Sequence, residues 1–217
     1  NVEGIEFIAR SCSNYLVPKK FPKLSRLRSV LKCIDWTINM FVDLRLFFWK
    51  RKNALYKPSS IEFIPEIDNE TDRFITEHRG SEVYRRNAEE LNWIIKYPWI
   101  LSAPIADKTV TKYYFSSISK SFFYLNIKVF DASDKMTGFI MLKVRDNVMS
   151  IPYLYFDSTA LKSILYLIGF LIIELNIDIF ITYNKDVLNN LAEINLPYLY
   201  KKNRSLYFCT QKTSMER

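Results

Sequence analysis

The stretch DSTALKSILYLIGFLIIELN, residues 157–176, is the most apolar part of the chain and decides the fold. Its central run, residues 161–175, is polar only at Lys162, Ser163 and Glu174. That run is shorter than the roughly 20 residues that a membrane-spanning helix needs. Strand patterns flank it, and a helix that joins two strands of one sheet crosses over the sheet and buries its inner face. The sequence therefore predicts a core helix.

Strand patterns lie on both sides of this core helix. Three apolar or alternating runs separated by turn residues precede it, which is typical of an antiparallel meander; they cover residues 121–131, 138–146 and 148–157. A strand, a helix and a hairpin with KKNR at its turn follow it, over residues 177–184, 185–196 and 197–211. Ahead of the meander are a strand and two helices, at residues 60–67, 68–80 and within 81–101. This order predicts an α/β fold with a mixed, mostly antiparallel sheet.

Polar residues mark the ends of several of these helices. Asp68 or Asn69 is placed to cap the helix at 68–80, and further acidic residues follow in its first turn. His78 lies near the C-terminus of the same helix, where a basic residue needs no other function. At the front of the core helix, Asp157 is expected to act as the cap.

Residues 1–56 differ from the rest of the chain. They open with an alternating, strand-like segment and continue in a basic connector that contains prolines. A helix over residues 29–52 follows, and a Pro- and Ser-containing linker comes after it. We therefore divide the chain into an N-terminal extension at 1–56, a candidate remnant of a preceding domain, and one domain at 57–217.

The helix at 29–52 leaves two interpretations open. A helix that is apolar nearly all round is buried or lies against lipid. Basic residues at both ends fit a membrane-surface helix, with the contact made by residues 26–52. Asp35 and Asp43 favour packing between two domains instead, because an acidic face is poorly suited to anionic lipid. With these aspartates and Arg45 inside it, the helix is not a spanning segment.

The composition restricts the classes of partner and site. The formal charge is +8, but no basic helix, zinc-knuckle spacing or RNP-type motif accompanies it, so no nucleic-acid partner is expected. Three cysteines without a CxxC pair and a single histidine indicate neither a metal site nor a disulfide framework. Free thiols fit a reducing cytosol, and the N-terminal residues lack the positive region of a signal peptide, so a cytoplasmic location is expected.

The order of elements over residues 60–212 resembles that of the GNAT superfamily of acyl-CoA N-acyltransferases. The run Leu91-Asn92-Trp93, with Pro98 a few residues on, is similar to the second-helix pattern of many bacterial members. Residues 181–210 also resemble the family's fifth strand, fourth helix and closing hairpin. The resemblance therefore implies a GNAT-like fold for this part of the chain.

The resemblance also implies a reaction. Family members bind acyl-CoA in a V-shaped gap between the fourth and fifth strands, and N–H groups at the start of the next helix hold its pyrophosphate. On this chain acetyl-CoA or another acyl-CoA would contact Tyr155, Phe156, Ser158, Thr159, Ala160 and Leu161. An amine attacks the thioester directly. A Glu or water takes the proton of the amine and a Tyr protonates the leaving thiolate, roles that fall on Glu90 and Tyr183.

The acceptor side is implied around the second helix. Arg85 and Arg86 suit an anionic acceptor or the CoA phosphates, and Trp93 and Asn184 are further expected substrate contacts. The acceptor would be a small-molecule or glycan amine, and no metal is implied. Proteins with this resemblance often contain two such domains, so a second GNAT-like domain or a homo-oligomer is an expected partner.

The chain departs from the family's motifs at two places. The usual phosphate cradle contains glycine, whereas DSTALK has none and begins with an acidic residue. The tyrosine of the family's fourth helix falls on Leu191, which leaves Tyr183 as the nearest substitute. Two other hypotheses stay open: a domain of the same fold without a cofactor site that acts as a structural or recognition module, and a basic membrane-surface adaptor.

Overall fold

The computed structural model describes residues 2–56, 58, 60–79, 86–102 and 117–206. The strands are β1 Val2–Ile8, β2 Ser60–Ile64, β3 Ile100–Ser102, β4 Ser117–Ser119, β5 Phe122–Phe130, β6 Met136–Arg145, β7 Val148–Phe156, β8 Ile179–Thr182 and β9 Tyr200–Leu206. The α-helices are α1 Ser13–Lys20, α2 Arg28–Lys52, α3 Asn69–Glu77, α4 Ala88–Lys96, α5 Leu161–Glu174 and α6 Lys185–Asn190. Short 3₁₀ helices are η1 Pro22–Leu27, η2 Ala54–Tyr56, η4 Ser158–Ala160 and η5 Leu191–Ile194.

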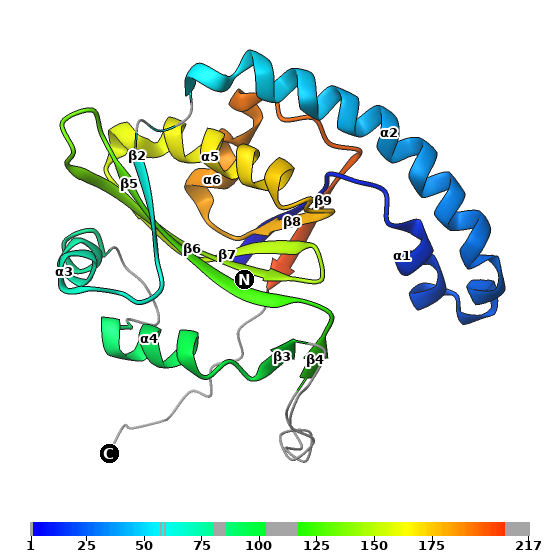
Figure 1. Cartoon of the computed structure of the whole chain (residues 1–217), viewed down its shortest axis with the longest axis horizontal. Helices are drawn as coiled ribbons and strands as arrows, with labels where there is room; N and C mark the ends of the chain where they lie inside the picture. The colour runs from blue at the N-terminus through cyan, green and yellow to red at the C-terminus, as the bar shows by residue number, and fades with distance from the viewer. Residues whose placement is uncertain (1, 57, 59, 80–85, 103–116, 207–217) are drawn as a thin grey trace, which may run out of the picture.

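A seven-stranded sheet runs through the molecule in the order β2-β5-β6-β7-β8-β1-β9 (Figure 1). Neighbouring strands in it are antiparallel except for β7 and β8, which are parallel. The separate strands β3 and β4 pair in parallel with each other. These pairings confirm the predicted α/β class with a mixed, mostly antiparallel sheet, and the predicted meander is β5-β6-β7.

The first strand of the chain lies inside this sheet. One edge of β1 pairs with β8 and the other with β9, so the predicted N-terminal extension contributes an inner strand. The predicted hairpin at 197–211 is wrong in its turn, because β9 runs straight through the KKNR residues. In place of a second hairpin strand, β1 supplies the hydrogen-bonding edge that β9 needs.

Helices cover both faces of the sheet (Figure 1). α5 is buried from Ile164 to Ile172 and lies over one face, as the sequence predicts for a core helix. On the other face, Phe74 of α3 and Leu91 of α4 pack around Phe139 of the sheet. No helix in the described part of the chain is long and apolar enough to cross a membrane.

α2 touches the body of the molecule along one narrow side. The buried residues of α2 are Asp35, Val42, Leu46 and Trp49. Gly169 of α5 leaves room for the indole, since a Cβ there would lie 2.5 Å from Cη2 of Trp49. The indole N–H also donates to the carbonyl oxygen of Ile194 at 2.8 Å. Most apolar side chains of α2 are exposed, so the predicted packing between two domains is not found among the described residues.

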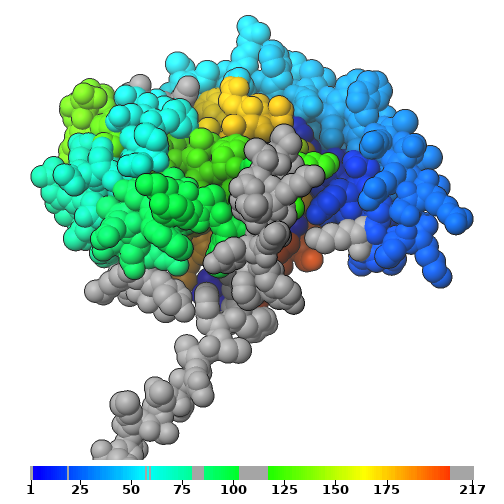
Figure 2. Space-filling model, turned by 60° about the horizontal axis from the view of Figure 1, so that its bottom comes forward, coloured from blue at the N-terminus to red at the C-terminus, as the bar shows by residue number. Residues whose placement is uncertain are grey.

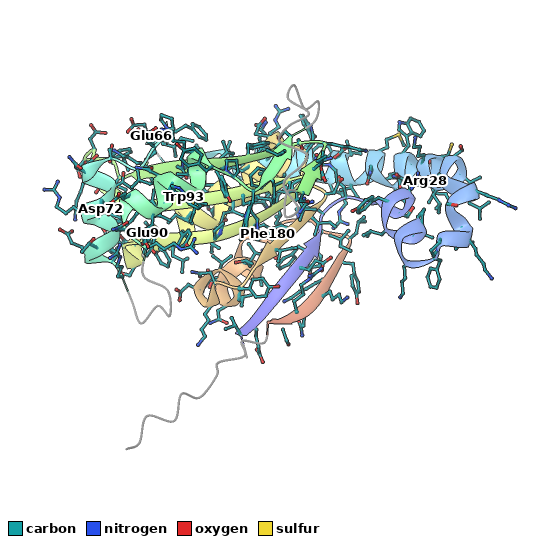
Figure 3. The ribbon with its side chains drawn as sticks, turned by 90° about the horizontal axis from the view of Figure 1, so that it is seen from below. Arg28, Glu66, Asp72, Glu90, Trp93 and Phe180 are labelled. Atoms are coloured by element: carbon teal, nitrogen blue, oxygen red, sulfur yellow. The ribbon has the colours of Figure 1, made fainter. Side chains whose placement is uncertain are left out.

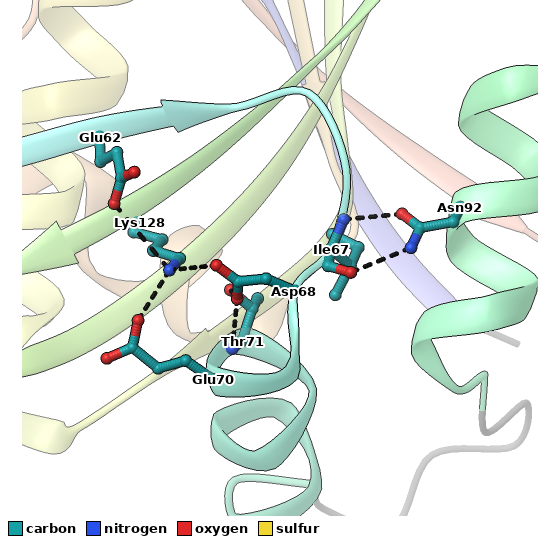
Figure 4. Close-up of polar contacts among 7 residues, drawn as sticks. All are labelled: Glu62, Ile67, Asp68, Glu70, Thr71, Asn92 and Lys128. Carbon is teal, nitrogen blue, oxygen red and sulfur yellow. Dashed lines mark hydrogen bonds and ion pairs between the residues drawn. The ribbon is translucent and has the colours of Figure 1, made fainter.

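A buried lysine attaches α3 to the sheet (Figure 4). Nζ of Lys128, on β5, lies 2.6 Å from Oδ2 of Asp68 and 2.7 Å from Oε2 of Glu70. Asp68, one of the two predicted caps, also caps α3 by accepting the N–H of Thr71. Burial alone would raise the pKa of Asp68, but the bonds from Lys128 and Thr71 outweigh it and lower the pKa to about 2.

An asparagine ties α4 to the same region (Figure 4). The side chain of Asn92 accepts from the N–H of Ile67 at 2.7 Å and donates to its carbonyl at 3.0 Å. Leu91 beside it is fully buried, while Trp93 is 63% exposed. The Leu-Asn-Trp run thus anchors the helix with its first two residues and presents the third at the surface.

Candidate functional site

β7 and β8 separate partway along β7. They pair at three positions, Val148↔Ile179, Met149↔Phe180 and Ser150↔Ile181. β8 then ends at Thr182, while β7 continues beside β6 to Phe156. The register between β6 and β7 shifts opposite Ile151 and Pro152. An extra residue bends a strand and Pro supplies no ladder N–H, and this bulge lies where the pairing of β7 with β8 ends.

The end of β7 leads directly into the first turn of α5. Ser158 and Thr159 are exposed, Ala160 is buried and Leu161 is half-buried. No side chain caps η4 or α5, so the predicted cap by Asp157 is wrong. The first backbone N–H groups therefore have no side-chain acceptor, and they carry the positive end of the helix dipole.

Asp157 is held by α3 and by the β5–β6 turn. Its Oδ1 lies 2.7 Å from Nε2 of His78, and its Oδ2 lies 3.9 Å from Nζ of Lys135. His78 stacks on Phe74, and its Nδ1 lies 2.9 Å from the carbonyl oxygen of Phe74. The histidine that the sequence assigns only to a helix terminus thus positions the acidic side chain that immediately precedes the first turn of α5.

A hollow of about 470 Å³ lies beside this first turn. Thr159 and Ala160 line it together with Lys162, Tyr56 and Asp131. Nζ of Lys162 lies 5.2 Å from the centre of the Tyr56 ring. Lys162 is an exposed cation at the start of α5 that the sequence prediction omitted, although a single basic residue in an apolar helix was a visible signal.

The two predicted cofactor contacts in β7 face opposite sides of the sheet, because successive side chains of a strand alternate. Tyr155 is 3% exposed and belongs to the core under α3 and α4. Phe156 is half-buried and packs against the core formed with α5. Of these two, only Phe156 lies on the side of α5.

Three predicted residues come together at the start of α4. Arg86, Glu90 and Trp93 line a hollow of about 510 Å³ together with Glu89; Figure 3 shows Glu90 and Trp93 on this helix. Glu90 also forms a capping box with Asn87, accepting its N–H at 3.0 Å and donating its own N–H at 2.9 Å. The spacing of Asn87 and Glu90 is the sequence signature of this box, which the prediction missed. Arg85 lies outside the described residues.

An aromatic hollow of about 320 Å³ adjoins the first. Arg86 and Trp93 line it too, and its other walls include Tyr97, Trp99, Tyr124, Pro152 and Tyr153. Burial and the neighbouring Tyr153 raise the pKa of Tyr124, and Arg86 acts in the opposite direction. This hollow therefore reaches the bulge at which β7 leaves β8.

Tyr183 and Asn184 point elsewhere. The ring of Tyr183 covers Gly4 of β1 so closely that a Cβ at this position would clash with it. A side-chain hydrogen bond joins Tyr183 to Arg204 of β9. Asn184 caps α6 by accepting the N–H groups of Asp186 and Val187. The contacts of both residues thus lie away from β7, and their roles in catalysis and acceptor binding stay predictions.

The described residues contain no cluster of three or more His, Cys, Asp or Glu side chains that could hold a metal ion. Comparison with known proteins adds no assignment: no family model matches the chain, and neither curated proteins nor solved structures gave a match. The geometry of the site has to carry the functional argument.

Proposed function

We propose that the chain is an N-acyltransferase of the GNAT type that transfers an acyl group from acyl-CoA to an amine. The separation of β7 from β8 after Ser150, with the first turn of α5 at the end of β7, carries the proposal. Open α/β sheets bind ligands in the crevice outside the carboxyl ends of their strands. The N-terminus of a helix that no side chain caps also offers free N–H groups to a phosphate.

The surroundings of this helix end support an anionic cofactor. Asp157 is hydrogen-bonded to His78 and lies 3.9 Å from the ammonium group of Lys135, whose charge partly offsets the carboxylate that would otherwise repel a phosphate. Lys162 adds a cation within the first turn. In this proposal the pyrophosphate lies against the N–H groups of Ser158 and Thr159, and small side chains there take the place of the family's glycines.

The acceptor enters from the α4 side. Aromatic rings attract ammonium groups through their negative faces, so the hollow between Trp93, Trp99 and Tyr153 suits an amine. Arg86 is placed to hold an anionic group on the same acceptor. The nitrogen of the neutral amine forms a C–N bond with the thioester carbonyl carbon, and its proton passes to water or to a glutamate of the hollow. The C–S bond then breaks, and CoA leaves as a thiol after its thiolate takes a proton from that acid or from solvent.

The alternative is a domain of this fold that serves only for recognition or structure. The position of Tyr183 favours it, because a catalytic acid has to reach the leaving thiolate, whereas this ring packs over Gly4 of β1. Calorimetric titration with acetyl-CoA and longer acyl-CoAs separates the two functions. Micromolar binding followed by thiol release with an amine panel supports the transferase, and no binding of any acyl-CoA refutes it.

Two variants test whether acyl-CoA binds at the first turn of α5. Ser158→Glu puts a carboxylate at the exposed helix end and is expected to weaken acyl-CoA binding about tenfold or more. Thr76→Glu, on the exposed side of α3, is the matched control and should leave binding unchanged. Equal affinities of the two variants would place the cofactor somewhere other than the first turn of α5.

A further inference from the structure

The outer face of α2 is apolar and uncovered. We use this name for Val30, Ile34, Met40, Phe41, Leu44 and Phe48, whose side chains are between 46% and 60% exposed. Their spacing of mostly three, four and seven residues places them on one side of the helix, opposite the residues that contact the body. At 1.5 Å per residue, α2 is about 37 Å long, so this is an extended surface.

The apolar surface continues at both ends of the helix. Phe21, which precedes η1, and Leu27, its last residue, are also exposed. Trp36 of α2 is 71% exposed. Near the other end, Phe47 lines a hollow of about 710 Å³ between α2, α5 and β2. In Figures 1 and 2, α1 and α2 project beyond the sheet and form one end of the molecule. Apolar patches of this extent on a protein surface mark interaction sites.

Both carboxylates of α2 are bound by the chain itself. Asp35 is 4% exposed and accepts hydrogen bonds from Ser11, Ser13 and Asn14. Asp43 lies 2.8 Å from Nε of Arg10, whose side chain is buried. The charge of Asp35 is therefore buried within the chain, and that of Asp43, whose side chain is 54% exposed, is paired with Arg10.

The other charges around the outer face are cationic. Arg45, Arg51 and Lys52 are exposed beside it along the second half of α2, and Lys23 and Arg26 are exposed in η1 just before the helix. Arg28 and Lys32 lie on the opposite side of the helix, where they line a hollow together with Asp146 and Asp178. Lys50 is paired with Glu174 of α5. A second copy of this face would set cations against cations, and a neutral apolar partner would leave them without counter-charges. An anionic surface with an apolar interior satisfies both the rings and the cations.

We propose that α2 lies in the surface of an anionic phospholipid membrane, with its outer face in the acyl boundary and its cations at the headgroups. Amphipathic helices with aromatic residues on one side and Lys and Arg at the rim bind membranes in this way. The proposal is independent of the acyltransferase assignment, because none of the residues that carry it lines the α4 hollows or the first turn of α5.

Vesicle flotation of the whole chain tests the proposal. The chain should float with vesicles of phosphatidylcholine and phosphatidylglycerol, and much less with phosphatidylcholine alone. Phe41→Ser/Phe48→Ser should weaken binding at least about tenfold, because it removes two apolar anchors. The matched control is Trp99→Ser/Tyr200→Ser, which removes comparably exposed rings elsewhere and should bind like the unaltered chain.

A second double variant separates the contribution of the cations to vesicle binding from that of the apolar side chains. Arg45→Gln/Lys52→Gln should lose about 25-fold in affinity for the anionic vesicles, roughly fivefold for each cation, and the loss should shrink at high salt. Circular dichroism and urea unfolding show that each variant is folded. Light scattering after gel filtration gives the oligomeric state.

Three results would overturn the proposal. One is failure of the unaltered chain to float with anionic vesicles. Another is equal binding of Phe41→Ser/Phe48→Ser and its control. The third is a dimer that Phe41→Ser/Phe48→Ser converts to a monomer while flotation is absent, which would assign the outer face to a second copy of the chain.

Discussion

Replacing Asp35 by asparagine tests how the α1–α2 hairpin is held together. Asp35 lies on the inner side of α2, and its carboxylate accepts five hydrogen bonds from residues 11–14. Oδ1 accepts from Ser11 Oγ, Ser13 N and Ser13 Oγ at 2.6–2.9 Å, and Oδ2 accepts from Asn14 N and Nδ2 at 2.8 and 2.7 Å. This single side chain therefore connects α2 to the beginning of α1.

The expected loss of stability follows from the number of hydrogen-bond donors that surround the Asp35 carboxylate. The substituted asparagine side chain has the shape of the aspartate but only one acceptor oxygen, so its NH₂ group must face the donors of Asn14 or of the serines. Two charge-assisted bonds are lost and the remaining ones become neutral, each change being worth about 1 kcal/mol or more. Because the donors share one acceptor group, the terms do not add in full, and we expect a loss of about 3 kcal/mol in the free energy of unfolding.

The pH dependence has a defined sign. Burial alone would raise the pKa of Asp35, but the bonds from Ser11, Ser13 and Asn14 outweigh it and hold the pKa well below its usual range. A carboxyl with a lowered pKa in the folded state stabilises the fold fully above its unfolded pKa of about 3.9, and this contribution is lost as the pH falls towards the folded value. The difference between the chain and its Asp35→Asn variant should thus be constant from about pH 7 to 5 and shrink below about pH 4.

Urea unfolding followed by far-ultraviolet circular dichroism measures the loss, and hydrogen exchange shows whether protection falls first in residues 11–35. Glu66→Gln is the control, because Glu66 is an exposed carboxylate and its removal should change stability by less than about 0.5 kcal/mol. A loss below about 1 kcal/mol, or a difference that stays unchanged from about pH 5 to 2, would show that the carboxylate is not bound as described.

Two further changes test the packing on either side of the sheet. Lys128→Met removes the buried cation below α3 and should cost about 1–2 kcal/mol, measured by urea unfolding, because the half-exposed carboxylates of Asp68 and Glu70 lose a charged hydrogen-bond donor; Lys135→Met, at a largely exposed lysine, should cost under about 0.5 kcal/mol. Gly169→Ala pushes a methyl group into Trp49 and should lower the melting temperature by several degrees, a loss of about 1–3 kcal/mol, whereas a gain in stability would mean that α2 does not pack on α5 as described.

Local patterns in the sequence predict much of the fold. The core helix follows from an apolar run between two strand patterns, and the meander follows from alternation and turn residues. Asp68 was identifiable as one of two candidate caps because the capping bond is made within the first turn of the helix itself. The place of β1 between β8 and β9 could not be predicted in this way, since strands far apart in sequence pair through edges that no local signal specifies.

The candidate site was less predictable for the same reason. Asp157 looked like a helix cap from its position, but it pairs with His78, which is 79 residues away. The bond of Tyr183 to Arg204 likewise depends on β9 lying next to β1. Glu90 is different, because its capping box with Asn87 is a local pattern that was available in the sequence.

The membrane proposal restricts the acceptor of the transferase proposal. α2 lies on the face of the sheet covered by α5, and its outer face points away from the body, while α4 lies on the opposite face (Figure 1). With the outer face of α2 in the lipid, the aromatic hollow beside Trp93 and Tyr153 is turned towards water. A water-soluble amine reaches this hollow without obstruction, whereas an amine embedded in the same bilayer would have to pass round the whole sheet. The two proposals together therefore favour a soluble acceptor, and vesicle binding should leave the apparent affinity for it unchanged.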